Sequence, residues 1–240
     1  MKSNIQGYWL GHSAFKFVTP SGKVIYVDPF LTHNPSTPEE HKTVEKADFI
    51  LLTHGHEDHV GDTIEIAANT GAKVVSIVEL SRLLVNKYDL GQDQALEFNK
   101  GGSIHFDEFS VTMVSANHSS SYNGDYAGEA AGLILSFEDD VCVYHMGDTN
   151  IFADLTLYGE LYEPHLVLAP IGDHYTMGPE EAAYAVEMLD ADVAIPIHYD
   201  TFPPIEADPD EFREKLEEIS ETEVYVPEIG TNFMANLAFG

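Results

Sequence analysis

One short stretch constrains this chain more than any other, because it places three histidines and an aspartate within six residues: HGHEDH at 54–59. An apolar run at 49–52 precedes it and reads as the end of a buried strand. On an extended segment residues two apart point the same way, so His54 and His56 present their rings to one point. A helix over 57–60 would carry Asp58 and His59 to a neighbouring point. The stretch therefore predicts two adjacent metal sites, and not a polar loop that is merely rich in histidine.

The length and composition of the chain are typical of a soluble globular protein. Its 240 residues are enough to bury a full core, and 44% of them are hydrophobic. No apolar run reaches the length of a membrane span, and residues 1–4 do not open a signal peptide. Cys142 is the single cysteine, so no internal disulfide can form. We therefore expect a cytoplasmic protein that does not bind a membrane.

The charge of the chain limits its partners. Eleven basic and 41 acidic residues give a formal net charge of −30. Such a surface repels phosphate backbones, and no basic patch is evident, so we expect no nucleic-acid partner. The acidity has two explanations that the sequence leaves open. One is solubility, and the other is a saline cytoplasm that would screen the self-repulsion.

Hydrophobic periodicity predicts many short strands, with helices spread through both halves of the chain. Strands are expected at 5–10, 14–18, 23–27, 47–52, 73–78, 110–115, 132–137, 141–146, 166–170, 193–197, 224–226 and 232–234. Helices are expected at 63–69, 79–88, 153–161, 179–189 and 210–219, with a surface loop and one short helix at 31–45. No low-complexity linker divides the chain. The pattern predicts one α/β domain over 1–240, with two sheets packed face to face and helices outside.

Four sets of candidate ligands begin loops that directly follow apolar runs. They are the cluster at 54–59, His118, Asp148 and His198. Loops at the carboxyl ends of strands are where α/β folds build their sites. A single histidine in such a position is more often a structural residue, but four sets in this order favour a metal centre.

The same residues resemble the metallo-β-lactamase fold superfamily. The resemblance spans nearly the whole chain and rests on THGHEDH at 53–59, His118, Gly147-Asp148-Thr149 and His198. It implies a four-layer αββα sandwich with a dinuclear site at one end of the sheets. His54 stands where the di-iron flavoprotein branch has a glutamate, and no flavodoxin-like domain follows. The implied ligands of one metal are His54, His56 and His118, those of the other are Asp58, His59 and His198, and Asp148 bridges the two.

Other motifs resemble a narrower group within that superfamily. These are WLGHSA at 9–14, VDP at 27–29, IGDHYTMGP at 171–179 and IHYDTF at 197–202. They are similar to the compact, mostly uncharacterised metal-dependent hydrolases related to the ascorbate-phosphate lactonase. Two positions depart from that pattern: Asp173 replaces a commoner glycine, and Pro164-His165 stands where Pro-Asp is usual. The resemblance therefore implies a metal-dependent hydrolase without naming its substrate.

Two divalent ions, Zn²⁺ first with Mn²⁺ or Fe²⁺ as alternatives, would lower the pKa of a bridging water and polarise the bond to be cut. Asp58 or Asp148 could hold or move the proton. His174 is a candidate to meet developing charge or to protonate the leaving group, or else a loop residue that caps its own backbone. His12 and Asp28 are candidates to orient the ligand imidazoles, or else plain turn residues.

The expected function is hydrolysis of a phosphoester, lactone or amide in a small molecule. Two alternatives stay open at this point. One is an enzyme that holds a single iron and oxidises sulfur, and the other is a metal-binding protein without catalysis. The substrate cannot be named from the fold, because activity lies in the loops around the site. Assembly into a homo-oligomer is also left open.

Overall fold

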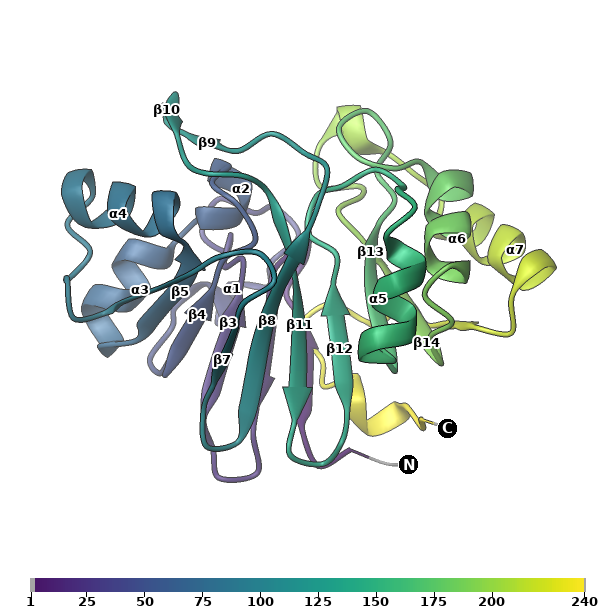
Figure 1. The fold of residues 1–240 in the computed structure, drawn as a ribbon, viewed down its shortest axis with the longest axis horizontal. Helices are drawn as coiled ribbons and strands as arrows, with labels where there is room; N and C mark the ends of the chain where they lie inside the picture. Colours follow the sequence, from purple (N-terminus) through teal and green to yellow (C-terminus); the bar gives the residue numbers. More distant parts are fainter. Residues whose placement is uncertain (1–2, 240) are drawn as a thin grey trace.

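The structure is a computed structural model, and it describes residues 3–239. Two large β-sheets pack face to face, and helices cover the outer face of each sheet (Figure 1). This arrangement confirms the αββα sandwich expected from the sequence. Helices α3 (Thr63–Thr70) and α4 (Val78–Lys87) cover the first sheet. The helices on the second sheet are α5 (Leu155–Tyr162), α6 (Pro179–Glu187) and α7 (Pro209–Ile219).

The first sheet has six strands in chain order. Its first three strands are antiparallel, and the remaining pairs are parallel. A parallel pair needs a crossover, and α3 and α4 supply those on either side of β5. The strands are β1 (Gln6–Trp9), β2 (Phe15–Val18), β3 (Val24–Val27), β4 (Phe49–Leu51), β5 (Lys73–Ile77) and β6 (Ala95–Phe98). Short helices α1 (Glu39–Lys42) and α2 (Glu57–Val60) lie in the loops around β4.

The second sheet has seven strands in the order β15-β14-β13-β12-β11-β8-β7. The half from β7 to β12 is antiparallel, and β12 to β15 are parallel. A small separate hairpin joins β9 (Ser121–Tyr122) to β10 (Asp125–Tyr126). The strands of the sheet are β7 (Ser103–His105), β8 (Phe109–Ser115), β11 (Ala131–Phe137), β12 (Cys142–His145), β13 (Leu166–Pro170), β14 (Val193–Ile197) and β15 (Glu223–Val224).

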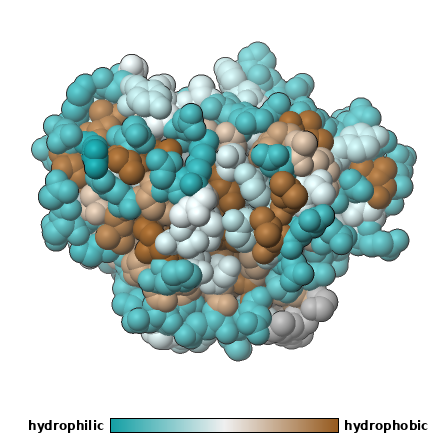
Figure 2. Space-filling model, in the orientation of Figure 1, coloured by the Kyte–Doolittle hydropathy of each residue, from teal (hydrophilic) through white to brown (hydrophobic). Residues whose placement is uncertain are grey.

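The core consists of two clusters of buried apolar residues. One fills the space between the sheets and continues under α3 and α4, and the other lies between the second sheet and its outer helices. Every residue of β13 and β14 is buried, as expected for parallel strands covered on both faces. Leu168 and Ile195 pack into the core between the sheets, whereas their neighbours Val167 and Ala194 pack against the outer helices. On the outside, Figure 2 shows hydrophilic side chains around the periphery of the molecule and apolar patches nearer the middle of this face.

The structure corrects the last two expected strands. The strand expected at 232–234 is wrong: Asn232 makes one isolated bridge with Tyr8, and the chain then turns into the 3₁₀ helix η2 (Met234–Asn236). The side chain of Asn232 takes the place of a ladder carbonyl, because its Oδ1 accepts a hydrogen bond from the backbone N–H of Gly7 at 3.1 Å. The strand expected at 224–226 is shorter in the structure, where β15 spans only Glu223–Val224. Pro227, which has no N–H to donate to a neighbouring strand, lies just beyond the expected end.

Strands β6 and β7 were not predicted from the sequence. Both are short edge strands, at the last position of the first sheet and of the second. An edge strand that is half exposed carries too few apolar residues for clear alternation, as in ALEF of β6 and SIH of β7. The one short helix expected within 31–45 is α1. Among the described residues, no helix combines the length and the apolar character that a membrane crossing requires.

Candidate metal centre

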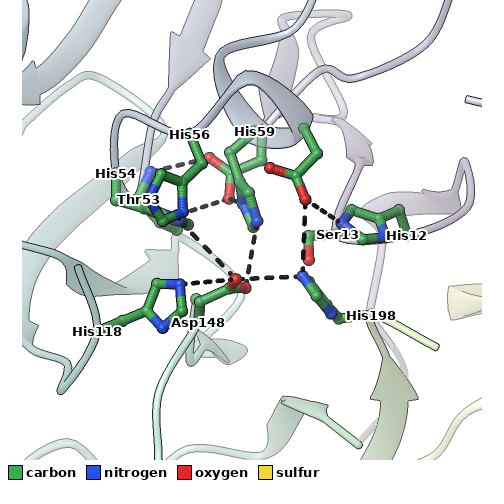
Figure 3. Close-up of polar contacts among 12 residues, drawn as sticks. His12, Ser13, Thr53, His54, His56, His59, His118, Asp148 and His198 are labelled. Carbon is green, nitrogen blue, oxygen red and sulfur yellow. Dashed lines mark hydrogen bonds and ion pairs between the residues drawn. The ribbon is translucent and has the colours of Figure 1, made fainter. Parts of the chain in front are cut away.

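Every predicted metal ligand lies at one end of the two sheets, where strands end and loops begin (Figure 3). The loop after β4 and helix α2 come from the first sheet, and the loops after β8, β12 and β14 come from the second. These loops supply, in chain order, His54, His56, Asp58, His59, His118, Asp148 and His198. The expected turn into a helix over 57–60 is α2. It brings the ring of His59 beside that of His54, with centroids 4.1 Å apart, and turns Asp58 toward His12.

A first group consists of His54, His56, His118 and Asp148, whose ligand atoms all lie within 4.8 Å of one another. Nε2 of His54 is 2.9 Å from Nδ1 of His56. Oδ2 of Asp148 is 3.4 Å from Nε2 of His118 and 3.9 Å from Nε2 of His54. Three imidazole nitrogens and one carboxylate oxygen therefore converge on one point, which is the donor set of a transition-metal site.

A second group consists of His12, Asp58, His59 and His198, again with ligand atoms within 4.8 Å. Oδ2 of Asp58 lies 3.1 Å from Nε2 of His12 and 3.9 Å from Nε2 of His198. The rings of His12 and His198 have their centroids 4.0 Å apart. The structure thus adds His12 to the three residues that the resemblance implied for the second metal.

Asp148 connects the two groups. Its Oδ1 lies 3.2 Å from Nε2 of His59, and its Oδ2 lies 3.1 Å from Nε2 of His198. The same Oδ2 faces His118 and His54 of the first group. Asp148 is 2% exposed. One buried carboxylate therefore faces both groups, as a ligand shared by two ions would.

Asp28 holds His59 in place. The left-handed turn at Asp28, with φ 45°, follows β3 and points the carboxylate at the loop after β4. Its Oδ2 accepts hydrogen bonds from Nδ1 of His59 at 2.7 Å and from Oγ1 of Thr53 at 2.6 Å, and its Oδ1 accepts one from the N–H of Thr53 at 2.9 Å. Because His59 donates from Nδ1, its Nε2 is the atom that faces Asp148 and the one whose lone pair a bound cation would take.

Thr53 fixes His54 through the same network. The hydroxyl of Thr53 has one proton, which it donates to Asp28. Its Oγ1, 3.0 Å from Nδ1 of His54, must therefore accept a proton from that ring. The lone pair of His54 then lies on Nε2, the atom that faces His56 and Asp148. One buried carboxylate consequently sets the tautomer of a histidine in each group.

His12 makes a contact that differs from the one expected. We expected it to orient an imidazole, but its Nε2 lies against the carboxylate of Asp58, and its Nδ1 is 2.9 Å from Oγ1 of Thr201. Its backbone carbonyl accepts hydrogen bonds from Nε1 of Trp9 and from the N–H of His198. His12 therefore joins the turn after β1 to both α2 and the loop after β14.

The protonation states of two histidines and of both aspartates suit cation binding. Burial lowers the pKa of His12 to about 4 and that of His54 well below its ordinary value, so both rings are neutral near pH 7. Burial alone would raise the pKa of Asp148, but the nearby His198 and His59 hold it well below its usual range. The hydrogen bond from His12 likewise outweighs burial and lowers the pKa of Asp58.

Three of the buried atoms that have no hydrogen-bond partner within residues 3–239 lie between the two groups. They are Nε2 of His59, Nε2 of His198 and Oδ1 of Asp148. Burying such atoms without a partner is costly, and a cation bound between them would remove that cost. Together with the imidazole and carboxylate donor set, these atoms show that the residues present fit divalent metal ions.

The structure does not bring His174 into either group. It lies in the loop after β13, where its side chain is exposed and its ring meets Tyr175 edge-on with centroids 4.5 Å apart. Among the contacts of the described residues, none joins His174 to a residue of the two groups. A role in protonating a leaving group therefore stays a prediction from the sequence.

Four further residues support the centre and were not assigned from the sequence. Thr53 and Thr201 contact His54 and His12 as described above. Oγ of Ser119 lies 3.4 Å from Nε2 of His56, and Oγ of Ser120 accepts a hydrogen bond from the N–H of Gly55 at 3.1 Å. Two signals in the sequence could have found them. Each lies within three residues of a predicted ligand, and Thr53 and Thr201 also lie in the motifs THGHEDH and IHYDTF.

Comparison with known proteins agrees with this geometry. The model of the beta-lactamase superfamily domain matches residues 6–198. A UPF0173 metal-dependent hydrolase of Koribacter versatilis is 46% identical over 213 residues, which cover 87% of this chain and 90% of that protein. Another from Methanopyrus kandleri is 44% identical over 230 residues, which cover 94% and 97%.

A solved structure shows the same fold. Igni18, a metallo hydrolase from the archaeon Ignicoccus hospitalis, superposes with a TM-score of 0.82 at 40% identity. The superposition covers 95% of this chain and 97% of Igni18. The chain therefore belongs to the beta-lactamase superfamily and, within it, to the UPF0173 family of metal-dependent hydrolases.

Proposed function

We propose that this protein uses two divalent metal ions, Zn²⁺ first with Mn²⁺ or Fe²⁺ as alternatives, to hydrolyse a phosphoester, lactone or amide bond in a small molecule. The observation that carries the proposal is the position of Asp148, whose buried carboxylate faces both groups. A single ion in the first group would leave Nε2 of His59 and Nε2 of His198 buried without a partner.

The residues of the chain have separate roles in this proposal. His54, His56 and His118 would hold one ion, Asp58, His59 and His198 the other, and Asp148 would contact both. Ions held in this way lower the pKa of water and polarise the bond to be cut. Asp28 and Thr53 set the tautomers that leave nitrogen lone pairs facing the centre.

Of the two carboxylates, Asp58 is the better placed to hold a proton. Its side chain is 32% exposed, whereas that of Asp148 is 3% exposed. Asp58 also has a neutral neighbour in His12, at 3.1 Å, which connects it to the hydroxyl of Thr201. A proton taken up at Asp58 can therefore reach solvent, while Asp148 fixes the separation of the two groups.

The test is metal reconstitution followed by a substrate screen. Chelated protein is reloaded with Zn²⁺, Mn²⁺ or Fe²⁺, its metal content is measured, and turnover of phosphodiesters, lactones, amides and thioesters is assayed. Two equivalents of metal and chelation-sensitive turnover are expected. One equivalent of iron in the first group would favour the sulfur-oxidising alternative, and two metals without any turnover would favour a binding role.

A matched pair of variants checks the ligand assignment. The His54→Ala, His56→Ala double variant should lose most of its metal, because it removes two of the three imidazoles of the first group. The His33→Ala, His105→Ala double variant removes two exposed histidines and should keep the parental content. Equal metal content in the two double variants would refute the assignment.

A further inference from the structure

We propose that the substrate carries no negative charge near the bond that is cut and places an apolar group against Phe202. This inference rests on the hydrolase proposed above and narrows its substrates to uncharged esters, lactones or amides. Phosphomonoesters, phosphodiesters and substrates with a carboxylate close to the reacting carbonyl would be excluded. The three observations that follow carry the inference.

The first observation is an exposed aromatic ring at the edge of the second group. Phe202 is 38% exposed, although it lies four residues after the buried His198. Its ring meets His12 edge-on, with centroids 5.9 Å apart, and meets Phe30 at 6.2 Å. Phe30 and His12 are themselves buried. An apolar surface therefore reaches from beside the second group to solvent, and covering it with an apolar group is favourable.

The second observation is the placement of the cations. No hydrogen bond, ion pair or cation–π contact described for residues 3–239 joins a lysine or arginine to either group. Lys87 approaches the β9–β10 hairpin, but Asp125 neutralises it at 2.7 Å. Arg82 forms its ion pair with Glu97. Sites that recognise phosphate or carboxylate groups usually add such cations, and the contacts of the described residues bring none to this centre.

The third observation is the charge of the loops that carry the ligands. Glu57 is the first residue of α2 and lies between the predicted ligands His56 and Asp58. Asp200 lies two residues after His198. The side chains of Glu57 and Asp200 are exposed. Asp173 is also exposed, and the preceding Gly172 packs so closely on His198 that an added Cβ would lie 2.1 Å from its carbonyl oxygen. Three exposed carboxylates therefore lie on three different segments that carry or contact the ligands. With a net charge of −30 they repel anionic substrates and leave neutral ones unaffected.

The experiment compares probes that share one leaving group. Metal-reconstituted protein is assayed with 4-nitrophenyl butyrate, 4-nitrophenyl hemisuccinate and bis(4-nitrophenyl) phosphate, and each rate is divided by the rate with hydroxide alone. The first two esters have acyl chains of equal length and differ in a terminal carboxylate. We expect kcat/KM for the butyrate to exceed that for the hemisuccinate by about tenfold or more at low salt. The difference should shrink in about 1 M KCl, where the Debye length is near 3 Å.

Two sets of variants locate the effect. Asp200→Asn and Asp173→Asn should each raise kcat/KM for the hemisuccinate and leave that for the butyrate unchanged. Asp140→Asn is the matched control: it makes the same charge change at another exposed residue with positive φ, in the hairpin turn between β11 and β12. Phe202→Ala should raise KM for the butyrate, and Phe202→Leu should largely restore it. Leu161→Ala, which alters an exposed leucine on α5, should have no effect.

The outcomes separate this inference from the proposed function. Equal or faster turnover of the hemisuccinate or the phosphodiester would overturn the inference and leave the metal-dependent hydrolase standing. Equal effects of Asp200→Asn and Asp140→Asn on kcat/KM for the hemisuccinate would also overturn the inference and leave the hydrolase standing. If the metal-loaded protein turned over none of these probes, and neither γ-butyrolactone nor a 4-nitroanilide, both proposals would fail together.

Discussion

Oδ2 of Asp28 lies 2.7 Å from Nδ1 of His59, and both side chains are fully buried. Asp28→Asn would remove the charge and leave one acceptor oxygen for three donors. The backbone should tolerate the change, because asparagine also adopts a left-handed φ. We expect the affinity for Zn²⁺ to fall about 10–100-fold, measured by competition with a chelator. Asp89→Asn, at an exposed residue with φ 61°, is the control, and equal affinities of the two variants would contradict the role given to Asp28.

Asp148→Asn tests the shared ligand. The amide keeps the shape of the side chain but replaces one oxygen with a donor, which cannot face a cation. We expect a folded protein that loses most metal from the second group and whose turnover falls by a factor on the order of 10³ or more. Elemental analysis and circular dichroism measure the first two effects. His174→Ala, by contrast, should keep both metals and lose only turnover. Two metals with near-parental turnover in Asp148→Asn would rule out a dinuclear mechanism.

Gly172→Ala tests how closely the loop after β13 packs on the second group. An added Cβ would lie 2.1 Å from the carbonyl oxygen of His198, so the loop or the histidine must move. We expect a loss of about 1–3 kcal/mol in the free energy of unfolding and less metal in the second group. Gly178→Ala is the control, because its added Cβ would meet nothing closer than 3.6 Å. Similar melting temperatures and metal contents for the two variants would contradict this close packing.

The metal-free protein should lose stability on acidification. Burial lowers the pKa of His12 to about 4 and that of His54 well below 6.5, so below pH 6.5 the unfolded chain binds protons that the folded protein does not. His59 acts in the opposite direction, because Asp148 and Asp28 outweigh burial and raise its pKa. Lowered pKa values at His56, His118 and His145 add to the first effect. We expect the melting temperature of chelated protein to fall by at least about 5 °C between pH 7.5 and pH 5, and a rise would show that His59 dominates.

The charge of the chain gives a prediction about partners. Nucleic-acid binding draws its free energy from cations that displace condensed counterions, and this chain has 11 basic residues against 41 acidic ones. We therefore expect no retention of labelled duplex DNA or RNA in about 0.15 M salt beyond that of an acidic control protein. A gel-shift titration measures it. Retention that weakens as the salt concentration increases would show that the protein has a basic surface that binds nucleic acid.

The sequence carried most of the information about the fold and the ligand sets. Burial on both faces makes β13 and β14 continuous apolar runs, and each is followed by a polar loop. Such boundaries are visible without a structure, so His198 and the cluster at 54–59 could be placed at strand ends. The convergence of His54 and His56 from an extended segment and the turn into α2 also followed from local rules.

Other features depend on contacts between distant segments, which no local pattern encodes. The contact of His12 with Asp58 could not be predicted, because it depends on how the turn after β1 docks on α2. Thr201 contacts His12 across 189 positions of the chain. Strand β6 could not be predicted either, because an edge strand needs only one apolar face. The segment 232–234 resembles a strand in sequence but does not form one beside β1, because the side chain of Asn232, and not a backbone carbonyl, accepts the hydrogen bond from Gly7.

The two groups draw on both sheets, and this has a consequence for how the protein matures. The residues at 54–59 follow a strand of the first sheet, whereas His118, Asp148 and His198 follow strands of the second. A nascent chain therefore cannot complete the first group until the loop after β12 has been synthesised, or the second until β14 has been synthesised, and both groups need the sheets to have docked. An ion held by all these residues fastens one sheet to the other in a chain whose single cysteine offers no covalent cross-link. Tight metal uptake would thus mark the end of folding and distinguish finished molecules from partly assembled ones.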